Sequence, residues 1–493
     1  MRLVSSLALL ALVSTANAQP NPEPKDGKVT IPLTLSPTAL PKPLSRYYLT
    51  PQYKEMQPGN RVPGYMKAYM EQASFFAKEP AAQREAWNLM KIEDLPLDEM
   101  RKSNAANLGG LAYREGKETV FLSDKRLIDF APTGRPLADV DEASRLLTSD
   151  WQVWFNLRRD GIELLLPEIQ KMRELASVLK VRMRYEIATK QFEKAAYSAR
   201  TYFGLVQSFE THPTLIASLV GLSIEAICLN ALEEMIAQPG CPNLYWSFAE
   251  IPAEGLNLRT AIQGEKLLCE TMFGSLLNAK GELPDAELKK VMAQLDMFVY
   301  LSREGVKKPL AASERYGKQA GDAKKVEATR AFLIETGMKP ALVQAMSPLQ
   351  AVMTADVRHY EVDLDEFFRV FQLPNAEAAK LGVEMEADLK ADSELTLSAY
   401  LLPAANKVRQ ANVRLQQRVA YLRVIEAIRL HAFENAGKLP AQLKDMKSTI
   451  PLDPVTGKAF DYTVKDGQAT LSGGNPNPGQ AATNRVYEIR IRK

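Results

Sequence analysis

One carboxylate stands inside a long apolar stretch of the chain. Between Pro213 and Ala231 the only charged residue is Glu225, close to the middle. A carboxylate in such a segment is expected to be buried, and burial raises its pKa, so that it could serve as a general acid. The interpretation that we favour is structural: Glu225 pairs with an arginine, such as Arg182 or Arg184, or faces a water-lined groove.

Acidic residues gather next to His359, one of three histidines in the chain. They are Glu361, Asp363, Asp365 and Glu366. A metal site would need a second imidazole at suitable spacing, as in H-E-x-x-H, which places two histidines on one face of a helix. The other histidines, His212 and His431, do not provide that spacing. We therefore expect a solvated acidic face here and predict no metal site.

The three cysteines, Cys228, Cys241 and Cys269, form no C-x-x-C motif. A thiol redox centre or a cysteine zinc site is therefore not expected. In an oxidising compartment two of them could pair and leave one over, and the sequence does not choose among the possible pairings. We favour three buried thiols, because cysteine often packs as a small apolar residue.

Short motifs of known chemistry are missing from the sequence. It contains no G-x-S-x-G elbow, no phosphate-binding P-loop and no Rossmann glycines, each of which would mark a catalytic or cofactor site. We predict no catalytic residue and no cofactor, and we favour a protein that is not an enzyme. The formal net charge of +3 over 493 residues indicates no concentrated basic surface, so no nucleic-acid partner is expected.

Two stretches are rich in lysine and arginine. The first is the poorly periodic segment 305–325, which includes Arg315, Lys318, Lys324 and Lys325. The second is one face of a predicted long helix, which carries Lys407, Arg409, Arg414, Arg418, Arg423 and Arg429. The first could bind an anion, and the second could attract an anionic polymer or lipid headgroups. We favour solvated faces whose long side chains cover packed apolar residues.

Aromatic residues cluster in a helix predicted over 141–157. Trp151 and Trp154 are three residues apart and would share one face of it, next to Phe155. We expect these side chains to anchor the helix on the hairpin that follows. An aromatic platform for a sugar is the alternative.

The elements that must position these residues are mainly helices. Apolar residues three or four apart predict a hairpin of helices over 167–189 and 191–210, followed by a helix over 213–238 that is apolar nearly all round. The third helix has the length of a membrane span, but Glu225 and several polar residues interrupt it. We predict a buried core helix and no transmembrane helix in the mature chain. Further helices are predicted over 62–76, 256–277, 285–301, 348–371 and 404–435.

The N-terminus has the pattern of a secretory signal peptide. Arg2 precedes an apolar run from Leu7 to Val13, and Ala16-Asn17-Ala18 fits a cleavage site, so residues 1–18 are predicted to be removed. We expect export by the general secretory route to the periplasm, the cell envelope or the outside of the cell. Prolines recur through 19–46, which predicts an extended tether with a short strand at 29–33.

The C-terminal segment 437–493 changes to an alternating pattern. Asp466-Gly467 predicts a hairpin turn between strands at 460–464 and 468–471, and residues 486–491 alternate as a third strand. The predicted fold class is mainly α, with stacked, irregular helical hairpins and a small C-terminal antiparallel sheet. The remaining expected regions are an N-terminal helical region at 47–160, a central helical-hairpin domain at 161–345 and a long-helix region at 346–436.

Three passages resemble known families. The runs Ser149-Asp150-Trp151, Arg159-Asp160-Gly161, Leu164-Leu165-Leu166-Pro167 and Arg173-Glu174-Leu175-Ala176, with Gly437-Lys438-Leu439-Pro440 near the end, are similar to a family of uncharacterised, exported, helical bacterial proteins. That resemblance implies no activity. The passage Pro451-Leu452-Asp453-Pro454-Val455-Thr456-Gly457-Lys458 also resembles type II secretion pseudopilins, whose prepilin peptide and membrane helix are missing here. The helix pair at 168–210 is similar to a tetratricopeptide repeat, with Tyr185, Phe192 and Ala196 in matching places.

Three functional hypotheses follow. The leading one is an exported, non-catalytic binding or scaffold protein of the cell envelope, which holds a protein or an envelope polymer in a groove between helix pairs. The second is an envelope hydrolase or lyase, which would need Glu225 and a second carboxylate facing each other in a cleft. The third is an accessory protein of the secretion machinery, suggested by the pseudopilin-like segment.

Overall fold

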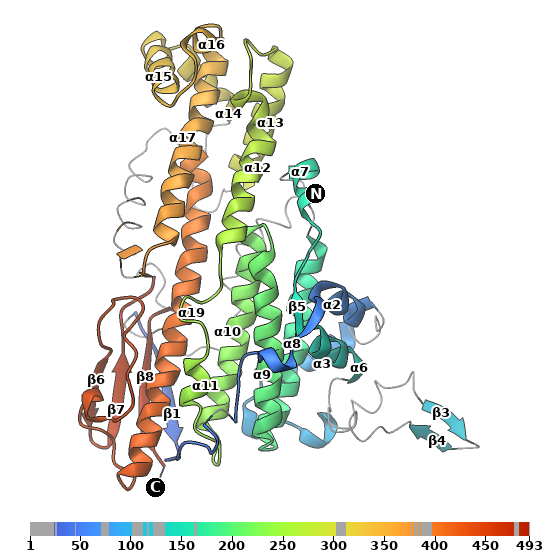
Figure 1. Ribbon diagram of the computed structural model, residues 1–493, viewed down its shortest axis with the longest axis vertical. Coiled ribbons are helices and arrows are strands. Elements are labelled where there is room, and N and C mark those ends of the chain that lie inside the picture. The colour runs from blue at the N-terminus through green and yellow to red at the C-terminus, as the bar shows by residue number, and fades with distance from the viewer. Residues whose placement is uncertain are drawn as a thin grey trace.

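The computed structural model of this chain describes residues 24, 27–44, 46–70, 78–100, 112–115, 118–121, 134–161, 164, 166–301, 312–375, 377, 378, 381, 385, 397–477 and 483–492. The predicted signal peptide at 1–18 lies outside the described residues, as do residues 305–311 of the first basic stretch. The fold is mainly helical with a small sheet near the C-terminus, as predicted. Long helices lie side by side along the longest axis, with the sheet at one end (Figure 1).

The predicted hairpin and the apolar helix after it form the centre of the molecule. α8 (Pro167–Ala188) and α9 (Phe192–Gln207) pack against each other, and both contact α10 (Leu215–Ala237). Among the described residues α10 is the one helix that is long and apolar enough to cross a membrane, but most of it is buried. It packs against α8, α9 and α19 (Leu397–Glu434). This burial is that of a core helix in a globular protein and agrees with the prediction.

The long helices α17 (Pro348–Phe371) and α19 run past the centre toward the far end of the molecule (Figure 1). α17 begins as its sequence predicts, because the Ser347 side chain accepts a hydrogen bond from the Gln350 amide at 3.3 Å. α12 (Arg259–Leu277) packs on α17 and leads to α13 (Asp285–Leu301). Three shorter helices complete this end: α14 (Ala312–Ala320), α15 (Ala323–Glu335) and α16 (Pro340–Gln344).

The sheet combines three strands from the C-terminal segment with one strand from the N-terminal segment. β6 (Asp461–Lys465), β7 (Gln468–Ser472) and β8 (Arg485–Ile491) pair antiparallel, as predicted. β1 (Val29–Leu35) pairs with β8 in parallel, so the order is β1-β8-β7-β6 and the sheet is mixed. The segment expected to be a tether therefore contributes an edge strand, which buries Val29, Leu33 and Leu35.

The helix expected over 141–157 is not one helix. α6 (Gly134–Ala143) covers only the first three residues of this range, β5 (Leu146–Thr148) follows and pairs with β2 (Gln57–Asn60), and α7 (Trp154–Asp160) begins only at Trp154. Trp151 lies between β5 and α7, so it does not share a helix face with Trp154. The other described elements are α2 (Arg61–Met70), α3 (Lys78–Leu89), β3 (Ala112–Glu115), β4 (Glu118–Phe121), α11 (Tyr245–Ala249) and short 3-10 turns at 53–55, 92–94, 208–211 and 443–445.

Candidate functional site

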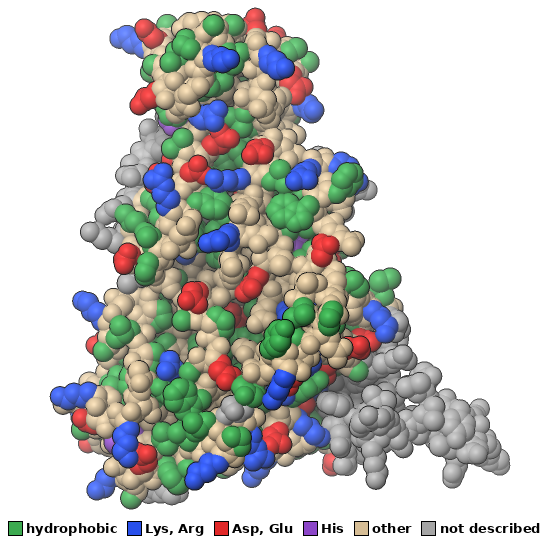
Figure 2. Space-filling model, in the orientation of Figure 1, with side chains coloured by type: hydrophobic (Ala, Val, Ile, Leu, Met, Phe, Trp, Pro, Cys, Tyr) green, Lys and Arg blue, Asp and Glu red, His purple; other side chains and the backbone are tan. Residues whose placement is uncertain are grey.

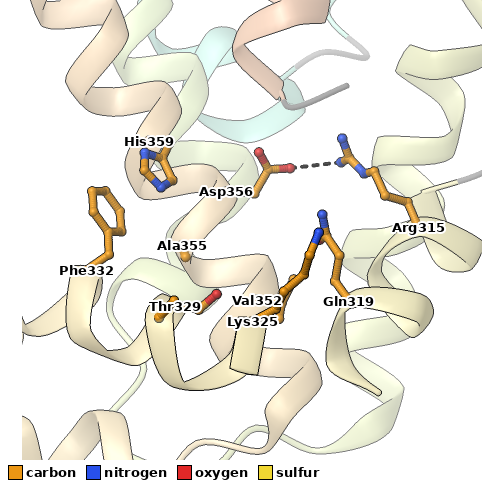
Figure 3. A pocket seen from close by; sticks show the side chains of 10 residues that line it. Arg315, Gln319, Lys325, Thr329, Phe332, Val352, Ala355, Asp356 and His359 are labelled. Atoms are coloured by element: carbon orange, nitrogen blue, oxygen red, sulfur yellow. Dashed lines mark hydrogen bonds and ion pairs between the residues drawn. The ribbon is translucent and has the colours of Figure 1, made fainter. Parts of the chain in front are cut away.

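A pocket of about 290 Å³ opens at the end of the molecule opposite the sheet, between α14, α15 and α17 (Figures 1 and 3). α14 and α15 are joined by a tight turn and both pack on α17. The lining residues come from all three helices: Arg315, Gln319, Lys325, Ala328, Thr329, Phe332, Val352, Ala355, Asp356 and His359.

Asp356 is the one carboxylate among the lining residues, and three donors hold it. Arg315 donates to its Oδ2 at 2.8 Å and the Tyr316 hydroxyl donates to the same oxygen at 2.5 Å. The backbone amide of Leu397 donates to Oδ1 at 3.1 Å. Burial raises the pKa of Tyr316 well above its ordinary value, and the charge of Asp356 adds to the shift. The tyrosine therefore stays protonated and keeps donating its hydrogen bond.

The rest of the lining divides into a polar side and an apolar side. The nitrogen-bearing ends of Gln319 and Lys325 point toward the middle of the pocket, and the Thr329 hydroxyl lies below them (Figure 3). Val352 and Ala355 form the apolar side on α17. At its edge the His359 ring stacks on Phe332, with centroids 3.6 Å apart and planes 8° apart.

His359 lines this pocket, but the acidic residues that follow it do not. Glu361 accepts a hydrogen bond from Arg358 at 2.7 Å, and Glu366 forms an ion pair with Arg369 at 2.9 Å. Asp365 pairs with Lys266 of α12. Within the described part of the chain, no group of three histidine, cysteine or acidic residues is arranged to hold a metal ion.

Glu225 is buried on α10, and its expected partners are engaged elsewhere. Burial raises the pKa of Glu225 to about 7, the positive charge of Arg418 opposes the shift, and the charge of Glu210 adds to it. Arg184 instead donates to Glu234 at 2.7 Å. The predicted pairing of Glu225 with Arg182 or Arg184 is therefore wrong, because Arg182 is held by Asp141 of α6 and Arg184 by Glu234, nine residues further along α10.

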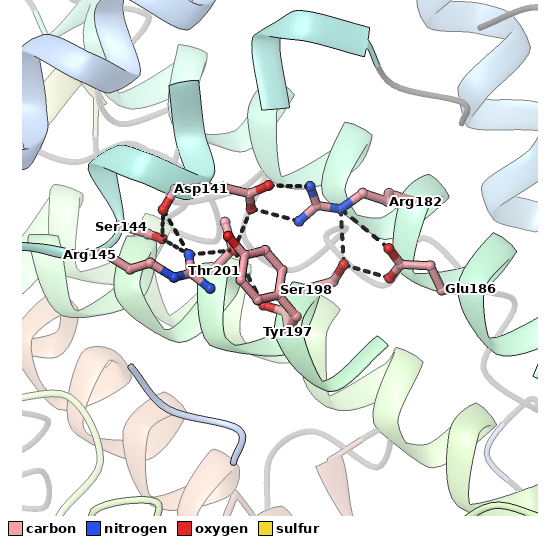
Figure 4. A network of polar contacts seen from close by, with 8 residues as sticks. All are labelled: Asp141, Ser144, Arg145, Arg182, Glu186, Tyr197, Ser198 and Thr201. Atoms are coloured by element: carbon pink, nitrogen blue, oxygen red, sulfur yellow. Dashed lines mark hydrogen bonds and ion pairs between the residues drawn. The ribbon is translucent and has the colours of Figure 1, made fainter. Parts of the chain in front are cut away.

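Arg182 lies in a polar network between α6, α8 and α9 (Figure 4). It donates two hydrogen bonds to Asp141, at 2.7 and 2.8 Å, and the Thr201 hydroxyl donates a third at 2.5 Å. On its other side Arg182 donates to the Ser198 hydroxyl at 2.9 Å, which in turn donates to Glu186 at 2.6 Å. Burial raises the pKa of Glu186 to about 7 against the charge of Arg182. Both carboxylates of the network thus lie in the core and join helices.

Two arginines expected on a solvated face of the long helix are buried instead. Arg418 donates to Asn230 at 2.7 Å and pairs with Glu233 of α10, which also accepts hydrogen bonds from Arg485 and Tyr487 of β8. Arg429 has no exposed surface and pairs with Glu426 at 2.7 Å. The prediction failed for these two residues because α10, α11 and α17 pack against α19, and the sheet contacts it where Tyr487 meets Tyr421.

Trp151 is a core residue and offers no platform for a sugar. Its indole nitrogen donates to the Ser208 carbonyl at 2.7 Å, and its ring meets the edge of His212 at 5.1 Å. Burial lowers the pKa of His212 to about 3, so this imidazole stays neutral near pH 7. Phe155 is 70% exposed and belongs to α7. The three cysteines are free and buried, which agrees with the interpretation favoured above.

Sequence reasoning singled out His359, Arg315 and Lys325, but it did not bring them together. It missed Asp356 and Phe332. Asp356 carried a usable signal, since it is a charged residue four positions after Val352 in an otherwise apolar part of the helix. A charge at such a position is buried and requires partners from neighbouring elements.

Charged side chains of both signs alternate over the face shown in Figure 2. No single sign dominates the part of that face that is described, so it gives no support to an extended basic surface of the kind that binds nucleic acid. Comparison of the chain with protein-family models, with curated proteins and with solved structures found no match.

Proposed function

We propose that this chain is an exported helical protein of the cell envelope that binds a ligand or partner without transforming it. Export rests on the N-terminal pattern of Arg2, the apolar run at 7–13 and the small residues at 16–18. The resemblance to exported helical bacterial proteins points the same way.

The observation that carries the binding role is the chemistry of the pocket between α14, α15 and α17. Hydrolysis by general acid and base catalysis needs two ionisable groups placed on the reacting bond. Asp356, the carboxylate of this pocket, is occupied by three donors. The remaining polar lining contains groups that can donate and accept hydrogen bonds. Such a site is suited to holding a ligand.

The buried carboxylates support the same proposal. Asp141 and Glu186 join helices through Arg182, and Glu233 joins α10 to α19 and β8. A substrate would have to enter a packed core to reach them. These groups are better explained as parts of the framework that joins α6, α8, α9, α10, α19 and β8.

A pair of matched substitutions on α15 tests the binding role. Ala328 lines the pocket and is exposed, so Ala328→Trp fills the pocket without disturbing the core. Ala331 is exposed on the same helix and does not line the pocket, so Ala331→Trp is the control. Mature protein immobilised on a resin is incubated with solubilised envelope, and retained components are identified by mass spectrometry.

We expect a component that the wild type and Ala331→Trp retain and Ala328→Trp loses. Equal retention by all three proteins would show that the pocket is not the binding site. Cleavage of an envelope polymer by the wild type, abolished by Glu225→Gln, would replace the proposal with the hydrolase hypothesis. Export is tested separately: protein recovered from the envelope fraction should begin at Gln19, and recovery of the full-length chain from the cytoplasm would refute it.

A further inference from the structure

We propose that β6, at the edge of the sheet, pairs antiparallel with β6 of a second copy of this chain, so that the two four-stranded sheets join into one continuous sheet. This interaction surface lies at the end of the molecule opposite the pocket and is independent of the binding role of that pocket. It follows from the unpaired edge of β6 and from the order of the side chains along it.

The backbone of β6 is paired on one side. β7 is its strand neighbour, and no other strand of the described residues lies along its outer edge (Figure 1). The turn between β6 and β7 consists of Asp466 and Gly467, with φ of 51° and 76°, and in such a turn the two flanking residues bond to each other. Because the bonding direction alternates along a strand, Tyr462 and Val464 then direct their N–H and C=O groups outward. Within the described part of the chain, these outward groups have no hydrogen-bond partner.

The side chains of β6 leave this edge accessible. Every residue of the strand except Tyr462 is exposed, and the Tyr462 hydroxyl donates to the Pro440 carbonyl at 3.0 Å. The apolar Val464 is 40% exposed. Neither Asp461 nor Lys465 has a side-chain partner among the residues that the structure describes. An exposed edge strand with an apolar side chain is the kind of strand that pairs with another chain.

The other edge of the sheet is less suited to pairing. That edge is β1, which contains the exposed Pro32 and also packs on α10. A proline has no backbone N–H to donate to a neighbouring strand. β6 contains no proline, so the sheet has one edge that is open to pairing along its full length.

The side chains of β6 are complementary to the same strand running in the opposite direction. A two-fold axis between the two copies of Thr463 places Asp461 opposite Lys465 of the second copy, and Tyr462 opposite Val464 of the second copy. Opposite charges, an aromatic with a β-branched residue, and two threonines are each favourable cross-strand pairs. The outward N–H and C=O groups of Tyr462 and Val464 meet in this same register. Backbone and side chains therefore select a second copy of the chain as the partner.

The expected dimer is a weak one, because a short strand covers little of the roughly 1,200–2,000 Å² that a stable interface buries. Sedimentation velocity of the full mature chain between about 5 and 500 µM measures the dissociation constant. We expect the fraction of dimer to rise across this range. Added salt should lower that fraction, because both charged pairs are exposed.

Two charge reversals test the register. Asp461→Lys or Lys465→Asp places like charges opposite each other at two points of the symmetric pair, so each variant alone should associate at least about tenfold more weakly than the wild type. In an equimolar mixture, the new lysine of one variant faces the new aspartate of the other, and the unchanged Lys465 faces the unchanged Asp461. The mixture should therefore associate about as tightly as the wild type. The control Lys458→Asp reverses an exposed charge outside β6, and it should change association less than about twofold.

A proline substitution tests the backbone edge. Val464→Pro removes an outward N–H and leaves the bonds to β7 intact, and proline is tolerated in edge strands at such positions. It should abolish association, whereas Val464→Thr keeps the N–H and a β-branched side chain and should retain it. Circular dichroism and urea unfolding of all variants check that the fold is kept.

Each other outcome overturns the inference. A chain that stays monomeric up to the highest concentration has no such pairing. Association that neither charge reversal weakens uses another surface, and a mixture that does not restore association refutes the register. Unchanged association of Val464→Pro would show that the backbone of β6 is not involved. None of these results depends on whether Ala328→Trp loses an envelope component.

Discussion

Removing the negative charge of Asp141 should strongly lower the free energy of unfolding of this protein. Asp141 is 7% exposed and holds the fully buried guanidinium of Arg182 through two hydrogen bonds (Figure 4). Burial alone would lower the pKa of Arg182, but the charge of Asp141 and its hydrogen bonds outweigh that effect and raise it. Asp141→Asn therefore leaves a charged arginine in the core that has lost its nearest carboxylate, while Glu186 lies 3.8 Å away.

The expected loss is about 3–5 kcal/mol, because a buried charge deprived of its partner keeps its desolvation cost. Domains of this kind have total stabilities of about 5–15 kcal/mol, so the effect is large. Urea unfolding followed by circular dichroism at pH 7 measures the free energy of unfolding. The control is Asp160→Asn, because Asp160 pairs with Arg159 at the surface, and it should leave the free energy of unfolding nearly unchanged.

A double variant separates the burial of charge from the loss of contacts. Asp141→Leu with Arg182→Met removes both charges and keeps apolar volume, so it should cost less than Asp141→Asn alone. The reasoning is refuted if Asp141→Asn lowers the free energy of unfolding by less than about 1 kcal/mol. It is also refuted if the double variant is as unstable as the sum of the two single charge removals.

Two further predictions concern α10 and α12. The pKa of Glu225 is raised to about 7 from 4.5 by burial, so between these pH values the folded state holds a proton that the unfolded state has lost, and stability falls as pH rises. Glu225→Gln removes this dependence on pH. It should raise the free energy of unfolding by roughly 3 kcal/mol at pH 8 and change it little at pH 4. Urea unfolding measures both values, and an equal effect at the two pH values would contradict the prediction. A side chain at Gly264 of α12 would overlap the carbonyl oxygen of Pro213, whereas one at Gly274 would meet only Asn278, at 3.6 Å. Gly264→Ala should therefore lower the free energy of unfolding by about 2 kcal/mol or more. Gly274→Ala should raise it by up to about 1 kcal/mol. Equal melting temperatures of the two variants would show that Gly264 does not lie close to the Pro213 carbonyl.

The helices could be predicted from the sequence because their signals are local. The apolar spacing along 167–188 and the Ser347-Pro348 start of α17 lie within the elements that they define. The Asp466-Gly467 turn likewise lies within its hairpin. For each of these, the residues near a position determine its structure.

Contacts between distant segments could not be predicted in this way. The pairing of β1 with β8 joins opposite ends of the chain, and although both strands were expected, nothing in the residues near either strand indicates the other as its partner. The partner of a buried charge is equally non-local: Arg182 meets Asp141 of α6, and Arg418 meets Glu233 of α10. Only the packing of whole helices decides such partners.

Only some residues of the candidate site could be identified from the sequence. His359 and Lys325 could be singled out by residue type, but the end of α15, the short helix α16 and the start of α17 lie between them. No residues near either position indicate that α15 folds back on α17. Phe332 was hidden because an aromatic residue in a helix is usually a core residue. The site exists only through the folding of α14 and α15 against α17.

The most direct test of the account compares what the wild type, Ala328→Trp and Ala331→Trp retain from solubilised envelope. Ala328 lines the pocket between α14, α15 and α17, whereas Ala331 is exposed on the same helix outside it. The account predicts a component that the wild type and Ala331→Trp retain and that Ala328→Trp loses. Equal retention by all three proteins would contradict it.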